Sequence, residues 1–290
     1  MAGRNQQPSS GGDVTEYTPV DETASDYGDY SLRVDTAAFH DSSDAELVFV
    51  NGMDNSPANH RRAARQLATI TGQTVVGIYN QTGLNGNENI PNRIMDFIQC
   101  VHDLSLPVGR SAPLLLGMQA LSNPSAVLAM LLARRSAGRI TPIRQAERLA
   151  GEAVLSLNRA SLALFGRLYD NAEKGKRTVI VCHSQGNLIS ANAVWVTKRT
   201  RHWATSPVGQ VSLFGLASPT ASWPPNNEDG FQFSLYRDDR DPVTLISVPG
   251  VGQRPTTQRG PGLHFSTHAI GNYFAFRRVQ EDLARSLRNA

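Results

Sequence analysis

The sequence has little of several features that would assign it to a special class of protein. It contains only two cysteines in 290 residues, Cys100 and Cys182, which is too few for a disulfide framework. No uninterrupted apolar segment reaches the roughly 18 residues that a membrane span needs. Neither sign of charge dominates, because 28 Lys and Arg stand against 25 Asp and Glu. This balance argues against a nucleic-acid partner.

The sequence begins MAGRNQQPSSGGD, which has no apolar region of the kind that a secretory signal peptide needs. We therefore expect a protein that is cytoplasmic at synthesis, and export by a route that reads no cleavable signal stays open. Residues 1–30 are rich in Gly, Ser, Asp, Thr and Gln and have few aliphatic side chains. We expect a flexible tail there and a folded domain over residues 31–290.

In the folded domain, short apolar runs alternate with helical patterns, which is typical of a parallel sheet covered by helices. The runs that predict strands cover 46–50, 74–79, 178–182, 210–216 and 231–236. Ser56 and Pro57 predict the start of a helix that Gly72 ends, and 269–290 predicts one terminal helix. The fold class is therefore expected to be α/β, with a mostly parallel sheet and helices on both faces.

Residues from about 85 to 140 interrupt this alternation with helical patterns that proline and glycine separate. We expect a helical insertion that could serve as a lid. Its apolar residues and the arginines around 134–148 favour plain helix packing and solvated helix faces. An acyl pocket or contact with a lipid surface is the alternative.

The segment VIVCHSQGNLISANAV places a serine between a strand and a helix. Such a serine needs small residues two positions before and two positions after it, and these are Cys182 and Gly186. Ser184 would project above the carboxyl ends of the strands, where open α/β sheets place their sites. The backbone N–H of Gln185, at the start of the helix, would donate to a substrate oxygen. His183 is expected to point to the opposite side of the turn.

A nucleophile of this kind needs a second oxyanion donor, which fold logic places in the loop after an earlier strand. Asn51-Gly52-Met53 follows the strand at 46–50, and the N–H of Met53 is our candidate donor. Without the serine turn, Asn-Gly would be interpreted as an ordinary tight turn.

A serine hydroxyl also needs a base and an acid that orients the base. Asp241, which precedes the rigid Pro242, is the first choice for the acid, and Asp238 is the second. His268, at the start of the terminal helix, is favoured as the base over His264, which lies between apolar neighbours. No pair of histidines has metal-ligand spacing with a carboxylate nearby, so we expect no metal and no cofactor.

Several segments together resemble the α/β-hydrolase superfamily, which orders its triad as serine, acid, histidine. They are CHSQGN after TVIV, the upstream VFVNGM, FGLASP, DPVT and a late histidine before NYF. FGLASP and DPVT are similar to segments that flank the acid in lipases of the triacylglycerol type. Cys182 stands where glycine is usual, and Asn51 where many members have histidine.

The resemblance implies an α/β-hydrolase fold in which the triad is Ser184, Asp241 and His268, with Met53 and Gln185 as oxyanion donors. We expect a serine hydrolase that cleaves a carboxylic ester, lipid esters included, through an acyl-enzyme on Ser184. Peripheral membrane contact stays open. So do a thioesterase, amidase or acyltransferase on the same triad, and a catalytically silent binding module or small-molecule receptor of the same fold.

Overall fold

The computed structural model describes residues 12, 14–17, 45–52, 55–81, 148, 152, 155, 158–198, 211–218, 230–241, 256–258 and 268–288. Its strands within these residues are β1 (Val14–Tyr17), β2 (Glu46–Val50), β3 (Val75–Ile78), β4 (Thr178–His183), β5 (Val211–Leu216), β6 (Phe231–Asp238) and β7 (Thr256–Gln258). Its helices there are α1 (Pro57–Thr71), α6 (Arg159–Glu173), α7 (Gly186–Lys198), α10 (Ile270–Phe274) and α11 (Arg277–Arg288).

The strands form one seven-stranded sheet in the order β1-β3-β2-β4-β5-β6-β7. All neighbours from β3 to β7 are parallel, and β1 pairs with β3 in the antiparallel direction. Every residue of β2, β3, β4 and β5 is buried, as expected of parallel strands that are covered on both faces. The predicted α/β class, its mostly parallel sheet and each predicted strand are confirmed.

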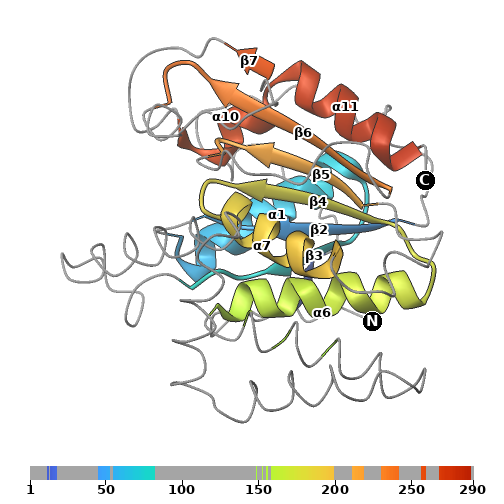
Figure 1. Cartoon of the computed structure of the whole chain (residues 1–290). Helices are drawn as coiled ribbons and strands as arrows, with labels where there is room; N and C mark the ends of the chain where they lie inside the picture. Colours follow the sequence, from blue (N-terminus) through green and yellow to red (C-terminus); the bar gives the residue numbers. More distant parts are fainter. Residues whose placement is uncertain are drawn as a thin grey trace, which may run out of the picture.

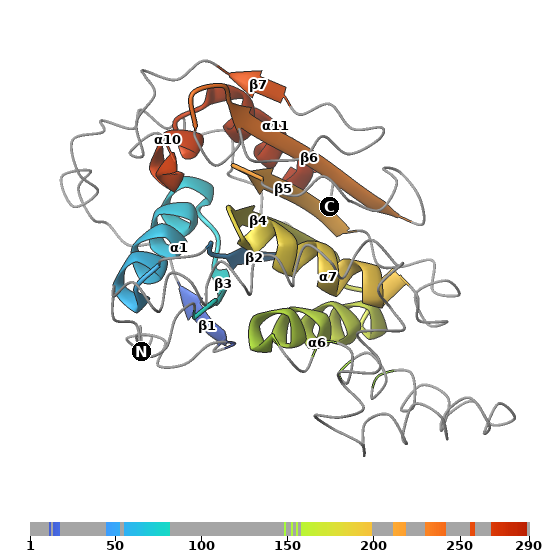
Figure 2. The ribbon, with the colours of Figure 1, turned by 60° about the vertical axis from the view of Figure 1, so that its left-hand side comes forward.

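Two hydrophobic cores lie on opposite faces of this sheet. On one face α1, α10 and α11 pack against Phe49, Val181 and Leu216. On the other face α6 and α7 pack against Val48 and Ile180. Figures 1 and 2 show the two groups of helices on either side of the strands. The prediction of helices on both faces is confirmed.

Local signals set the ends of α1 as predicted. The Ser56 hydroxyl caps the helix by accepting from the N–H of Asn59 at 3.2 Å, and Pro57 occupies the first helical position. Gly72 follows the last turn with a φ of 65°, a left-handed conformation that glycine adopts without strain.

The N-terminal strand was not predicted. The sequence analysis assigned Val14–Tyr17 to a flexible tail, and the structure instead pairs these residues with β3 at the edge of the sheet. Tyr17 is fully buried and packs over Gly77, where an added Cβ would lie 2.5 Å from Cε2 of Tyr17 and 2.6 Å from Nε2 of His60. The tail prediction is wrong at these residues because one buried tyrosine ring holds the segment on the sheet.

The C-terminal segment was expected to form one helix and forms two. α10 ends at Phe274, whose carbonyl accepts from the Gln280 side chain at 2.6 Å, and α11 begins at Arg277. The break lets Tyr273 lie over the carboxyl end of β6, while α11 directs Leu283 and Leu287 into the core. A continuous helix could not satisfy both contacts.

The expected helical insertion at about 85–140 lies outside the described residues. Within the part of the chain that the structure does describe, no helix has the length and apolarity to cross a bilayer.

His60 on α1 is buried among aromatic rings. It stacks on Phe49 with ring centroids 5.3 Å apart and meets Tyr17 and Tyr79 edge-on at 5.9 and 5.4 Å. Burial lowers the pKa of His60 to about 3 from an ordinary value of 6.5. The folded protein therefore keeps this ring neutral at pH values where the unfolded chain protonates it.

We predict that His60→Phe flattens the acid side of the stability profile. Between pH 6.5 and about 3 the unfolded chain binds a proton at His60 that the folded protein does not. The free energy of unfolding therefore decreases as the pH is lowered through this window. Phenylalanine keeps the ring packing, and its introduction should remove up to about 1.4 kcal/mol per pH unit from this slope. Urea denaturation across the window measures the free energy of unfolding, and equal slopes in both proteins would contradict the prediction.

Candidate active site

Ser184 lies at the turn between β4 and α7 in a strained backbone conformation. Its φ is 54°, which is the left-handed region that residues other than glycine rarely enter. Its N–H donates to the carbonyl of Leu216 at the end of β5, at 3.0 Å. The prediction that Ser184 lies on a sharp strand-to-helix turn is confirmed.

Two glycines make room for this turn. A Cβ on Gly186 would collide with the carbonyl oxygens of Val50 and Asn51, so only glycine lets α7 begin against the end of β2. A Cβ on Gly52 would lie 2.5 Å from Cβ of Ser184 and 3.2 Å from its Oγ. The loop after β2 therefore passes directly beside the candidate nucleophile, where the sequence analysis placed it.

Asn187 clamps the turn from inside the fold, and the sequence analysis did not single it out. Its side-chain amide donates at 2.9 Å to the carbonyls of both Ser184 and Leu216. Its Oδ1 accepts from the Cys182 thiol at 3.4 Å, in a space that Gly215 leaves open. Burial raises the pKa of Cys182, so this cysteine serves as the small residue that the turn needs. It stays an uncharged thiol.

Asp241 and His268 meet as predicted. Nδ1 of His268 lies 2.8 Å from Oδ2 and 3.0 Å from Oδ1 of Asp241. Asp241 is fully buried, and His268 keeps 21% of its side chain exposed. With Nδ1–H donating to the carboxylate, Nε2 carries the lone pair that a general base needs.

The alternative acid, Asp238, has another role. Its Oδ1 accepts from the N–H of Arg240 at 2.9 Å, and its carbonyl accepts from the N–H of Asp241 at 3.2 Å. Asp238 therefore shapes the turn that carries Asp241. The geometry favours Asp241, the first choice, as the partner of the histidine.

Tyr273 is a further residue of this cluster. Its hydroxyl donates to Oδ2 of Asp241 at 2.6 Å and accepts from the N–H of Asp238 at 3.3 Å. Burial raises the pKa of Tyr273, and the carboxylate of Asp241 raises it further. The phenol therefore keeps its proton and holds Asp241 in place. The sequence analysis noted Tyr273 only as packing for His268, because a donor 32 residues away is invisible in a linear pattern.

His183 does not point away from the site, and the prediction that it would is wrong. Its Nε2 donates to the carbonyl of His268 at 2.7 Å, and the two rings lie 4.7 Å apart. Burial, and to a smaller extent the neighbouring His268, lowers the pKa of His183 to about 3. The ring is neutral, and through this bond the residue before Ser184 fastens the backbone of His268 beside the serine turn.

Gln185, which the sequence analysis predicted as an oxyanion donor, belongs to a buried amide network. Gln185 accepts through Oε1 from the Asn80 side chain at 3.1 Å. The N–H of Asn80 donates to Oδ1 of Asn51 at 2.8 Å, and the Asn51 amide donates back to the carbonyl of Asn80 at 3.0 Å. The ends of β2 and β3 are thereby tied to Gln185, the residue that precedes α7. Asn80 was missed because it follows its strand without any motif.

Two predicted residues, Met53 and His264, lie outside the described residues. Among the residues that are described, no hydrogen bond joins the Ser184 hydroxyl to the His268 ring. The site thus brings together a serine on a strained turn, a histidine that contacts the preceding residue His183, and a buried acid on that histidine. In serine enzymes the bond between nucleophile and base is often loose until substrate is bound.

The described part of the chain contains no group of three or more histidines, cysteines and carboxylates that could hold a metal ion. Comparison of the sequence and the structure with family models, curated proteins and solved structures finds no match.

We predict that Gly186→Ala destabilises the protein by about 1–3 kcal/mol, because its Cβ has to displace the backbone at the end of β2. Gly166→Ala is the matched control. A Cβ there meets nothing within 4 Å, so alanine in α6 should stabilise by up to about 1 kcal/mol. Urea denaturation measures both changes, and equal effects at the two positions would contradict the proposed close packing.

Proposed function

We propose that the protein is a serine hydrolase that cleaves carboxylic esters, lipid esters included, through an acyl-enzyme on Ser184. One observation carries the proposal. The strained Ser184 turn lies at the carboxyl ends of the strands, and its preceding residue His183 bonds the backbone of His268, whose Nδ1 lies 2.8 Å from the buried carboxylate of Asp241. Nucleophile, base and orienting acid are the three groups that acyl transfer to a serine requires.

In the proposed reaction, Oγ of Ser184 attacks the ester carbonyl carbon while Nε2 of His268 takes its proton. The proton then passes from His268 to the departing alcohol, and the C–O bond to that alcohol breaks. Water then attacks the acyl carbon and gives a proton to Nε2 of His268. The bond from the acyl carbon to Oγ of Ser184 breaks, Oγ takes that proton back, and the carboxylic acid is released. Asp241 accepts from Nδ1 throughout and stabilises the imidazolium.

The oxyanion of the intermediate needs donors that are already in place. Gln185 stands at the N-terminal end of α7, where backbone N–H groups and the helix dipole favour negative charge. Its side chain is held by Asn80 at 3.1 Å, so its backbone has little freedom to turn away. The N–H of Met53 remains the proposed second donor, and Gly52 carries its loop to within contact distance of Ser184.

We also propose that the chain has an α/β-hydrolase fold and that a lid covers the candidate active site. The mostly parallel sheet and the serine turn after β4 support an α/β-hydrolase fold. The triad order along the chain supports it as well. Residues of about 85–140 are proposed to form a helical lid over the site.

A fluorophosphonate probe tests the nucleophile and the base together. We expect intact-mass spectrometry to find one adduct on the wild-type protein and none on Ser184→Ala. His268→Ala should be labelled at least about 100-fold more slowly, which is the scale of a lost general base. Labelling of His268→Ala at the wild-type rate would move the base to His264. A folded wild-type protein that stays unlabelled, with and without lipid vesicles, would refute the hydrolase and favour a silent binding module.

The acid is tested with a matched pair of variants. Asp241→Asn should slow ester hydrolysis by roughly 10³–10⁴-fold, because an amide no longer selects the required histidine tautomer. Asp238→Asn, three positions earlier, keeps the oxygen that accepts from Arg240 and should change the rate little. Steady-state hydrolysis of a series of p-nitrophenyl esters measures both. Equal losses in the two variants would mean that the rate of hydrolysis depends on the structure of the loop and not on the Asp241 carboxylate.

A further inference from the structure

Asn51 is the first residue after β2, and its side chain bonds two other residues inside the protein. The residue is 1% exposed. Its Oδ1 accepts from the N–H of Asn80 at 2.8 Å, while its Nδ2 donates to the carbonyl of Asn80 at 3.0 Å and to the carbonyl of Gly52 at 2.8 Å. An asparagine amide has two N–H donors, so both are committed. These three bonds give the Asn51 side chain one fixed orientation.

The bonds to Asn80 join the ends of two neighbouring strands. The paired residues of β2 and β3 end at Val50 and Ile78, and beyond this pair the Asn51 amide bonds both backbone groups of Asn80. A side-chain amide thereby satisfies buried backbone groups where the strand pairing ends. The network continues to Gln185, whose Oε1 accepts from the Asn80 side chain at 3.1 Å. The first proposed oxyanion donor is therefore linked to Asn51 through one residue.

The third bond of Asn51 fixes the carbonyl of Gly52. This carbonyl accepts from Nδ2 of Asn51 at 2.8 Å and from Nδ2 of Asn55 at 3.3 Å, so both of its lone pairs have a donor. The same peptide unit carries the N–H of Met53, which is the second proposed oxyanion donor. In a planar trans peptide the C=O and the N–H point in opposite directions. The two asparagines that hold the carbonyl therefore also direct the N–H of that peptide away from themselves.

This constraint is needed because residue 52 is a glycine. A Cβ on Gly52 would lie 2.5 Å from Cβ and 3.2 Å from Oγ of Ser184, so no larger residue fits beside the serine. Glycine has wide conformational freedom, and the peptide unit that follows it can turn over at little cost. A turned peptide would exchange the directions of the N–H and the carbonyl. A carbonyl oxygen repels the oxyanion that the N–H would stabilise.

We propose that Asn51 is a positioning residue of the oxyanion site, an inference that rests on the hydrolase proposed above. Asn51 holds one donor through the Gly52 carbonyl and the other through Asn80 and Gln185. It acts by keeping the two N–H groups in place before the substrate binds. Donors that are fixed in advance stabilise the transition state more than the bound ester, because the negative charge on the carbonyl oxygen develops only during the reaction.

Asn51→Ala tests this role in the steady-state hydrolysis of a p-nitrophenyl ester. We expect kcat to fall by roughly 10–100-fold, the scale of a misplaced oxyanion donor, and KM to stay within about twofold of the wild-type value. Loss of an interaction that is made only in the transition state lowers kcat and leaves KM unchanged. Titration to completion with a fluorophosphonate gives the concentration of active sites, so that kcat refers to folded protein only.

A trifluoromethyl ketone provides a measurement that partial unfolding does not change. Oγ of Ser184 adds to the carbonyl carbon of the ketone, the Oγ proton passes to His268, and the carbonyl oxygen becomes an anion that needs the same donors. The dissociation constant of this adduct should rise in Asn51→Ala by the factor by which kcat/KM falls. A variant that had only lost stability would bind less inhibitor, with the wild-type dissociation constant.

Asn171→Ala is the matched control for the loss of a buried asparagine. Asn171 is 3% exposed, and its Nδ2 donates to Oε1 of Glu46 at 3.1 Å and to Oγ1 of Thr178 at 3.0 Å. Thr178 is the first residue of β4, so these bonds lie at the opposite end of that strand from Ser184. The control should lose thermal stability, as Asn51→Ala does, and keep the wild-type kcat and KM.

Asn55→Ala removes the second donor to the Gly52 carbonyl from a less buried position. It keeps the role testable in the event that Asn51→Ala does not fold. The bond from Asn55 is longer than the bond from Asn51, 3.3 Å against 2.8 Å. We therefore expect a smaller loss, with kcat lowered about 2–5-fold at unchanged KM, which is the scale of one ordinary hydrogen bond.

The outcomes separate the role of Asn51 from the hydrolase itself. If the wild-type protein is labelled and hydrolyses esters, a folded Asn51→Ala with the wild-type kcat overturns the role and keeps the hydrolase. Where that variant does not fold, Asn55→Ala with the wild-type kcat does the same. Equal losses of kcat in Asn51→Ala and Asn171→Ala also overturn the role, because they would reflect a general loss of packing. A folded wild-type protein that is neither labelled nor active refutes the hydrolase, and the role of Asn51 with it.

Discussion

The candidate site depends on one constraint, the left-handed backbone at Ser184. A φ of 54° costs a residue with a side chain on the order of 1–3 kcal/mol, and it persists only where the surroundings enforce it. Here Leu216 accepts the serine N–H, the Asn187 amide spans the carbonyls on both sides, and Gly52 and Gly186 allow neighbouring backbone to close in. The strained conformation holds Ser184 at the carboxyl end of β4, directly beside Gly52 in the loop after β2.

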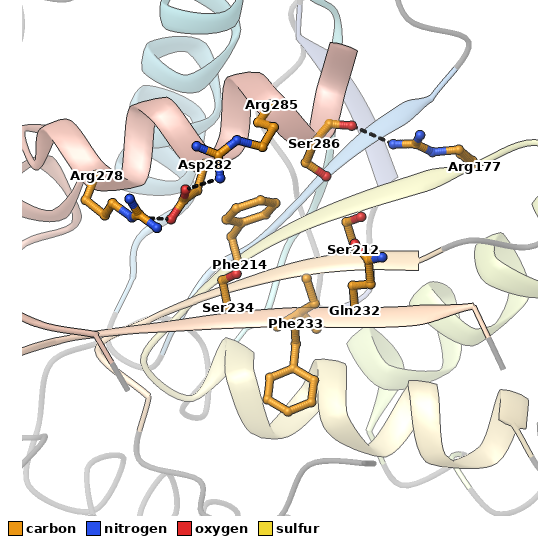
Figure 3. A pocket seen from close by; sticks show the side chains of 11 residues that line it. Arg177, Ser212, Phe214, Gln232, Phe233, Ser234, Arg278, Asp282, Arg285 and Ser286 are labelled. Atoms are coloured by element: carbon orange, nitrogen blue, oxygen red, sulfur yellow. Dashed lines mark hydrogen bonds and ion pairs between the residues drawn. The ribbon is translucent and has the colours of Figure 1, made fainter. Parts of the chain in front are cut away.

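The other half of the site depends on the break between α10 and α11. The short helix lets Tyr273 donate to Asp241, and His183 fastens the backbone just before that helix by donating to the His268 carbonyl. α11 is then free to follow its own apolar stripe into the core. Its polar side is left over β5 and β6, where Arg278 and Arg285 help to line a hollow (Figure 3). The break thus lets Tyr273 reach Asp241 while α11 still packs into the core.

Much of the fold could be predicted because its signals are local. Apolar runs located the strands, and Ser56, Pro57 and Gly72 located the ends of α1, since caps act over a few residues. Asp241 was preferred to Asp238 from a neighbouring proline, and the structure pairs it with His268. The prediction for His183 was wrong because its ring bonds the carbonyl of His268, a partner 85 positions away that no local pattern describes.

The sequence by itself determined the α/β class and the serine turn, because each rests on residues that are close along the chain. Only the tertiary structure decided which polar groups hold the proposed triad. Asn80 reaches Gln185 across 105 positions, His183 reaches His268 across 85, and Tyr273 reaches Asp241 across 32. It also decided that Arg177 and the arginines of α11 share one hollow. Such contacts follow from how helices and strands dock, and docking is set by the summed burial of two cores rather than by any local pattern.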